Sequence, residues 1–278
     1  MRWILKALVV VLPIALIVGG LRLCERAGGD RWLSRVREVD PRAQLALDRA
    51  DVICIAPDAA EGQRAGEFAA EFRQALEENY GDLLGTGAGQ RMVVVMFSEP
   101  DMVSAYAGRD ILREQGQSMA GYTDPSQNAV YVPYEADLQI LRHELVHLVM
   151  GTASEGTVRY SPWVMEGLAQ YFERYDPPNM RAFPPEARAF TRMASGSGVD
   201  LKRLLRLQDY PLFVGEQGAR NYLEAEALAS FLMETRREQF RKYIDMERTR
   251  PSGRYELFVS IVGDPDGQLG TDFRRYLQ

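Results

Sequence analysis

The spacing of apolar residues predicts strands in the first half of the chain and mostly helices in the second. Met92–Phe97 is a continuous apolar run, which is typical of a strand buried on both faces, and Asp51–Ala56 is a second strand candidate. Between these runs, residues 62–80 carry a large apolar side chain at every fourth position, which predicts a helix with one face in the core. These side chains are Phe68, Phe72 and Leu76. Together the segments predict an α+β domain.

Helical signals dominate the second half. Leu138–Val149 is periodic in its apolar residues, and Ser161-Pro162 offers an N-cap and a first-turn proline for a helix that continues to Phe172. Before them, residues 121–133 predict two short strands joined by a turn at Asp124-Pro125. Further helices are predicted at 99–107 with a continuation to 115, and at 181–193, 201–207, 221–234, 255–262 and 273–277.

The first 30 residues have a different pattern. Arg2 and Lys6 precede Ala7–Leu21, fifteen residues without a charge, as in a membrane anchor or a secretory signal. Because no Ala-x-Ala cleavage site follows, we favour an uncleaved transmembrane anchor over a cleaved signal. Residues 31–278 then form one domain. The amphipathic segment Trp32–Asp51, interrupted by a proline, is expected to lead into that domain as two short helical pieces.

Charge and cysteine content exclude some classes of protein. The formal net charge of −6 argues against a nucleic-acid-binding surface. Two cysteines do not make a disulfide framework. Cys54 lies in the apolar run that we expect to be a strand, and we interpret it as a buried, inert thiol.

Both histidines of the chain lie in the helix predicted at Leu138–Val149. His143-Glu144-Leu145-Val146-His147 reads H-E-x-x-H. Residues four apart lie on one face of a helix, so both imidazoles can be directed at the same metal ion. Two neutral imidazoles are two of the ligands that a tetrahedral Zn²⁺ takes. Glu144 lies beside them, where it can accept a proton from a metal-bound water.

A catalytic zinc ion needs a third protein ligand, and no further histidine is available to supply it. The third ligand must therefore be a carboxylate or a cysteine. Glu166 lies one turn into the second predicted helix, next to Gly167, which has no side chain to block a neighbouring helix. The eighteen residues between His147 and Glu166 are enough for the first helix to end and the second to return alongside it.

The complete pattern is H-E-x-x-H, eighteen residues, and then Glu in W-x-x-E-G-x-A. It resembles the gluzincin metallopeptidases, including the peptidase MA-like families, and the resemblance covers roughly Gly121–Glu173. It implies a zincin-like metallopeptidase fold, a small mixed sheet with helices. It also implies that His143, His147 and Glu166 bind zinc and that Glu144 is the general base.

The resemblance carries two further expectations. In zincins an edge strand precedes the metal-binding helix and can pair with an extended substrate. Ala129–Val132 is our candidate, although an ordinary strand that closes the sheet explains it equally well. Gluzincins also use a later Tyr or His to hydrogen-bond the oxyanion of the tetrahedral intermediate. Because no histidine is left, Tyr222 is the first candidate, with Tyr131 and Tyr210 behind it.

Two features limit the resemblance. The G-x-M-E-N signature, with which the aminopeptidase branch binds the free amine of its substrate, is absent, so an aminopeptidase is disfavoured. Glu224 and Glu226 lie near the predicted start of the helix at 221–234. Either carboxylate could accept a hydrogen bond from the outer N–H of a metal-binding histidine, but a solvated helix face is the stronger interpretation for both.

The sequence therefore predicts a membrane-anchored, zinc-dependent metallopeptidase that acts on a peptide or protein substrate. An extracytoplasmic catalytic domain is expected because gluzincins are often exported. The alternative is a catalytically inactive metal-binding scaffold or partner-binding module of the cell envelope. Hydrolysis of a non-peptide amide in the envelope is a third possibility.

Overall fold

The computed structural model describes residues 28–86, 91–107, 121–134, 138–153, 160–194, 199–250 and 252–278. The apolar segment predicted to be a membrane anchor lies outside these residues, as does the expected continuation of a helix beyond residue 107. Within the described part of the chain, no helix combines the length and the apolar character that crossing a membrane requires.

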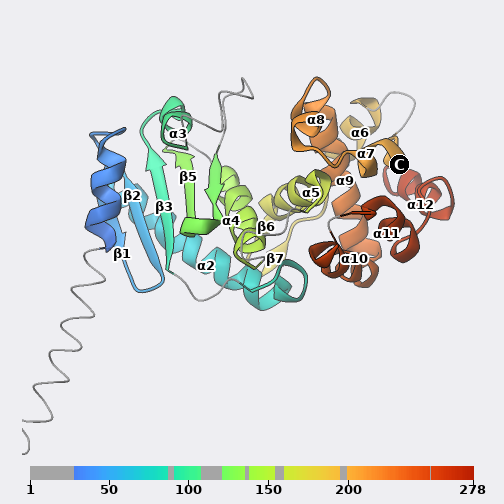
Figure 1. Ribbon diagram of the computed structural model, residues 1–278, viewed down its shortest axis with the longest axis horizontal. Coiled ribbons are helices and arrows are strands. Elements are labelled where there is room, and N and C mark those ends of the chain that lie inside the picture. Colours follow the sequence, from blue (N-terminus) through green and yellow to red (C-terminus); the bar gives the residue numbers. More distant parts are fainter. Residues whose placement is uncertain are drawn as a thin grey trace, which may run out of the picture.

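A five-stranded mixed sheet organises the first half of the molecule (Figure 1). Its strands, in spatial order, are β1 (Gln44–Asp48), β2 (Val52–Ala56), β3 (Met92–Phe97), β5 (Ala129–Pro133) and β4 (Tyr122–Asp124). The three inner strands run parallel, and each edge strand is antiparallel to its neighbour. The α+β fold class is confirmed, together with both strands predicted from the apolar runs.

Helices cover both faces of the sheet because successive side chains of a strand point to opposite sides. One face carries Cys54 and Val130 and packs against α2 (Ala59–Leu84) and α4 (Leu138–Ala153). The other face packs against α3 (Pro100–Ala107) and a helical stretch at 28–37. Every residue of β3 is buried, as its continuous apolar run predicts. Burial also raises the pKa of Cys54 to about 12, which agrees with an inert thiol.

One prediction about the sheet is wrong, and the structure excludes one of two alternatives left open for another strand. Within the segment expected to be two helical pieces, only 28–37 is helical, and Gln44–Asp48 is instead the edge strand β1. Its pairing with β2 supplies main-chain hydrogen bonds that local periodicity does not reveal. The strand at Ala129–Pro133 is not an edge either, because it lies between β3 and β4. The chain turns at the short 3₁₀ helix η1 (Pro125–Gln127) and at Asn128, whose φ of 50° is left-handed, and this turn folds β4 onto the free side of β5.

Helices form the second half of the molecule (Figure 1). They are α5 (Pro162–Glu173), α6 (Pro185–Ala194), α7 (Leu201–Arg206), α8 (Tyr210–Val214), α9 (Gly218–Thr235), α10 (Arg237–Thr249), α11 (Arg254–Ile261) and α12 (Gln268–Tyr276). A two-stranded hairpin, β6 (Tyr175–Asp176) and β7 (Asn179–Met180), follows α5. The sequence did not predict α8 or α10: the first has only five residues, and the second begins in a mixed-charge run.

Helix α5 joins the two halves, since it packs against α4 on one side and α9 on the other. Gly167 makes the second contact possible. A Cβ atom at this position would lie 2.6 Å from the carbonyl oxygen of Ala225 on α9, well inside van der Waals contact. The absence of a side chain at Gly167, expected from the sequence to allow close helix packing, therefore has that effect here.

Candidate metal centre

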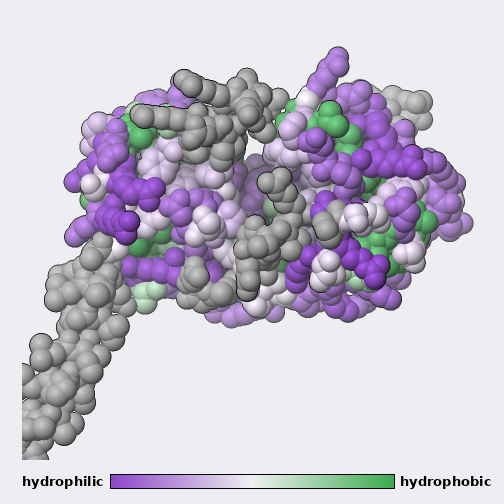
Figure 2. Space-filling model, viewed as in Figure 1, coloured by the Kyte–Doolittle hydropathy of each residue, from purple (hydrophilic) through white to green (hydrophobic). Residues whose placement is uncertain are grey.

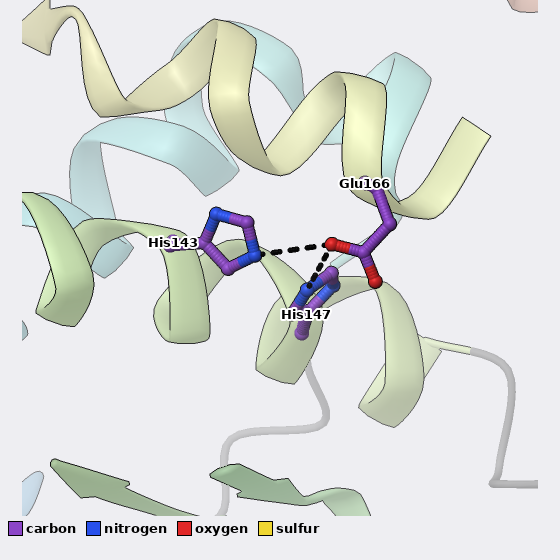
Figure 3. A group of neighbouring side chains, drawn as sticks. All are labelled: His143, His147 and Glu166. Atoms are coloured by element: carbon purple, nitrogen blue, oxygen red, sulfur yellow. Dashed lines mark hydrogen bonds and ion pairs between the residues drawn. The ribbon is translucent and has the colours of Figure 1, made fainter. Parts of the chain in front are cut away.

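The neighbouring helices α4 and α5 bring His143, His147 and Glu166 together (Figure 3). Oε2 of Glu166 lies 3.2 Å from Nε2 of His143 and 3.6 Å from Nε2 of His147. The two imidazole rings are one helical turn apart, with centroids separated by 4.7 Å and planes at 82°. One nitrogen of each ring and one carboxylate oxygen thus face a common point, as the motif spacing predicts.

These separations fit the ligand set of a divalent metal ion. Bonds of about 2.0–2.1 Å in a tetrahedral arrangement place neighbouring ligand atoms about 3.3 Å apart. The two measured nitrogen–oxygen separations, 3.2 and 3.6 Å, bracket that value. Two imidazoles and a carboxylate suit Zn²⁺ best, although other divalent ions accept the same ligands. The three residues could therefore hold a metal ion without a rearrangement of the helices.

The charges of the cluster are strongly coupled. Burial alone would favour the neutral acid at Glu166, which is only 3% exposed, but the adjacent imidazoles lower its pKa well below the usual range. Burial likewise opposes a charged imidazole at His143. Hydrogen bonds to the carboxylates of Glu166 and Glu173 outweigh that effect and raise the pKa of His143 to about 10. Metal binding at this ring would therefore release a proton.

Glu173 is a residue of the site that the sequence analysis missed. Its Oε1 accepts a hydrogen bond from Nδ1 of His143 at 2.7 Å, so Nε2 of that ring is directed toward Glu166. A carboxylate on the outer nitrogen is the usual way to orient a metal-binding imidazole. The sequence spacing could have indicated this residue, because Glu173 follows Glu166 by seven residues on the same helix and therefore lies on the same face. For His147, no partner of Nδ1 is found among the described residues.

Glu144 lies beside the cluster and is 7% exposed. Its carboxylate is held against the edge strand β4, where the hydroxyl of Thr123 lies 2.6 Å from its Oε2. Gly121, just before β4, faces the same carboxylate, and a Cβ atom there would come within 2.7 Å of Oε1 of Glu144. The carboxylate of Glu144 therefore lies between α4 and the edge of the sheet.

The three tyrosines considered from the sequence have different positions. The hydroxyl of Tyr210 lies 3.3 Å from that of Tyr222. Burial and the charge of Glu166 raise the pKa of both, in the case of Tyr222 to about 12, so both hydroxyls keep their protons at neutral pH. Tyr131 points to the sheet face opposite α4 and does not approach the cluster. Tyr210 and Tyr222 therefore both lie near the carboxylate of Glu166, whose charge acts on each hydroxyl.

Glu224 and Glu226, near the start of α9, do not lie on a solvated face, so the interpretation favoured from the sequence is wrong. Glu224 is fully buried, and its carboxylate accepts hydrogen bonds from Arg203 at 2.5 Å and Arg220 at 2.7 Å. Glu226 lies 3.5 Å from Arg174. Burial raises the pKa of Glu226 to about 7. None of the contacts found for these two acids reaches the imidazoles.

The start of α5 is tied to α10 rather than capped by its own serine. Ser161 occupies the N-cap position, as predicted, but its side chain makes no capping hydrogen bond. Its hydroxyl and its main-chain N–H instead donate to Oε1 of the fully buried Glu247, at 2.5 and 3.1 Å. This connection anchors the helix that carries Glu166.

The cluster lies where the two halves of the molecule meet, because α4 packs on the sheet and α5 on the helical half. In Figure 2 the surface is hollowed between these halves. No family model matches the sequence, and no curated protein matches it either. The functional argument therefore depends on the residues of the cluster and their geometry.

Proposed function

We propose that this protein is a zinc-dependent metallopeptidase of gluzincin type, tethered to a membrane by its N-terminal segment and acting on the extracytoplasmic side. One observation carries the proposal: His143, His147 and Glu166 direct three ligand atoms at one point, and Glu144 lies beside that point. A mixed sheet whose antiparallel edge strand lies next to α4 also supports a zincin-like fold.

Each group of the site has a separate role in the proposed hydrolysis. Zn²⁺ held by the three ligands supplies Lewis acidity and lowers the pKa of water. Glu144 takes the proton of the attacking water and passes it to the leaving amine. The hydroxyls of Tyr210 and Tyr222 are placed to donate hydrogen bonds to the oxyanion of the tetrahedral intermediate.

The edge strand supports a peptide as substrate. Among the described residues β4 pairs only with β5, so its other side can offer main-chain groups to an extended chain. We therefore assign to Tyr122–Asp124 the role first expected for Ala129–Val132.

Full-length protein purified in detergent, with a mixed peptide library, tests the proposal. Glu144→Gln should retain the metal and lose hydrolysis, since it removes the base but no ligand. Glu78→Gln, an exposed acid of α2, serves as the control. If Glu144→Gln cleaves peptides as fast as wild type, the mechanism is wrong. Stoichiometric metal in the wild type without any chelator-sensitive cleavage would favour the alternative, a metal-binding scaffold of the envelope.

A further inference from the structure

Thr123 is the residue of the edge strand whose side chain reaches the candidate general base. Its hydroxyl oxygen lies 2.6 Å from Oε2 of Glu144 and 2.9 Å from the main-chain carbonyl oxygen of the same residue. Both distances are those of good hydrogen bonds. A single hydroxyl thus faces two acceptors on one residue of the metal-binding helix.

The alternation of side chains along β4 gives Thr123 this orientation. Its neighbour Tyr122 points to the other face of the sheet, where its ring stacks on Tyr131 with centroids 5.6 Å apart. Thr123 and Gly121 therefore face α4, and the space that a Cβ atom of Gly121 would fill is taken by the side chain of Glu144. The base rests on a surface that these two residues of the edge segment form.

The chemistry of a hydroxyl suits it to both forms of Glu144. A threonine hydroxyl has one proton to donate and two lone pairs to accept with, and it rotates freely. When the carboxylate is ionised, the hydroxyl donates its proton to Oε2. When the carboxyl group carries the proton taken from water on its other oxygen, Oε2 can still accept from the hydroxyl, and the proton remains available to the leaving amine. Each form of Glu144 then keeps a hydrogen bond without movement of a heavy atom.

We propose that Thr123 is a positioning residue that holds Glu144 in one orientation before and after it accepts the proton. This inference rests on the proposed function, because it assigns Thr123 a task in the same reaction. Thr123 touches neither the metal ligands nor the reacting atoms, so it acts through Glu144.

The test compares Thr123→Val, which keeps the shape but removes the hydroxyl, with Thr123→Ser, which keeps the hydroxyl. Thr152→Val is the matched control, since the partners found for the Thr152 hydroxyl within the described part of the chain are carbonyl oxygens of α4, at 2.8 and 3.2 Å. In the full-length, metal-loaded protein, Thr123→Val should lower kcat about tenfold or more, the loss typical of a hydrogen bond to a charged group. KM and bound metal should remain unchanged, and the serine variant should retain most of kcat.

Equal kcat values for Thr123→Val and Thr152→Val would overturn the inference, as would an equal loss in the valine and serine variants at position 123. A wild type without chelator-sensitive turnover refutes the proposed function and this role with it. Normal turnover that Thr123→Val leaves intact refutes only the role of Thr123.

A double-mutant cycle tests the contact without reference to activity. It combines Thr123→Val with Glu144→Ala and compares the unfolding equilibrium constants of the four proteins. The two changes should be non-additive by about fivefold or more, as for residues in contact. Additive effects would mean that the hydroxyl does not hold the carboxylate, and the inference fails.

Discussion

Replacing Gly167 with alanine should weaken both the fold and the metal site, because one contact serves both. The new Cβ atom would lie 2.6 Å from the carbonyl oxygen of Ala225, 3.0 Å from its carbonyl carbon and 3.2 Å from Cβ of Ala229. The first two atoms belong to the backbone of α9, so no side-chain rotation relieves the clash. Helices α5 and α9 must therefore move apart by about half an ångström or more, given that carbon and oxygen atoms in contact are roughly 3.2 Å apart.

Two opposing effects set the size of the loss. Alanine favours a helix over glycine by about 1 kcal/mol. Overpacking a rigid contact costs about 1–3 kcal/mol, and more when backbone must shift. The clash should prevail, with a net loss of up to about 2 kcal/mol. Because Glu166 is the adjacent residue, the same shift displaces a metal ligand, and ligand distances tolerate only about 0.2 Å.

Urea unfolding of the metal-free protein and competitive chelator titration of bound zinc measure the two effects. Gly81→Ala is the control, since Gly81 lies in α2 and, among the residues that the structure describes, its added Cβ would meet only the methyl group of Thr86, at 3.1 Å. The control should be neutral or slightly stabilised, with unchanged zinc affinity. Gly167→Ala that is as stable as the control, or that binds zinc as tightly as wild type, would refute the reasoning.

Three further predictions concern the charges and hydroxyls of the site. Glu166→Ala should lose zinc at free concentrations that leave the wild type loaded; undiminished metal by elemental analysis would remove this residue from the site. Tyr210→Phe and Tyr222→Phe should each lower kcat, by about a hundredfold for the hydroxyl that donates to the oxyanion. Steady-state kinetics in which neither variant loses activity would contradict this. Burial raises the pKa of Glu226 from 4.5 to about 7, so the stability that its protonated form contributes is present below pH 4.5 and is lost as the pH rises to 7. Glu226→Gln avoids this loss, and its advantage over wild type in urea unfolding should grow with pH to about 3 kcal/mol. A difference that stays constant with pH would disprove the assignment.

The elements that carry the metal ligands could be predicted from the sequence. The apolar periodicity of Leu138–Val149 and the Ser-Pro start of the next helix predicted α4 and α5, which the structure confirms. The four-residue spacing of the two histidines then placed both imidazoles on one face. The absence of any other histidine left a carboxylate or a cysteine as third ligand, and Glu166 is the carboxylate that the structure brings to the imidazoles.

Contacts across elements could not be predicted in the same way. Nothing in the sequence around Thr123 indicates a bond to Glu144, because that contact exists only when β4 folds onto β5 at the edge of the sheet. The position of Tyr210, on a helix of only five residues, depends on the packing of α8 against α5 and α9. The buried carboxylate of Glu224 likewise depends on Arg203, which comes from α7.

The sequence by itself thus indicated His143 and His147 as candidate metal ligands, with Glu166 as the candidate third ligand, and it predicted the helices that present them and the inner strands of the sheet. The helices show a period of 3.6 residues and the inner strands are apolar runs, and both signals are visible in a single segment. Only the tertiary structure decided which strand lies at the edge, which tyrosine hydroxyls lie near Glu166 and which residue holds Glu144. Each of these depends on main-chain pairing or side-chain packing between segments distant in sequence, and such contacts leave no local pattern.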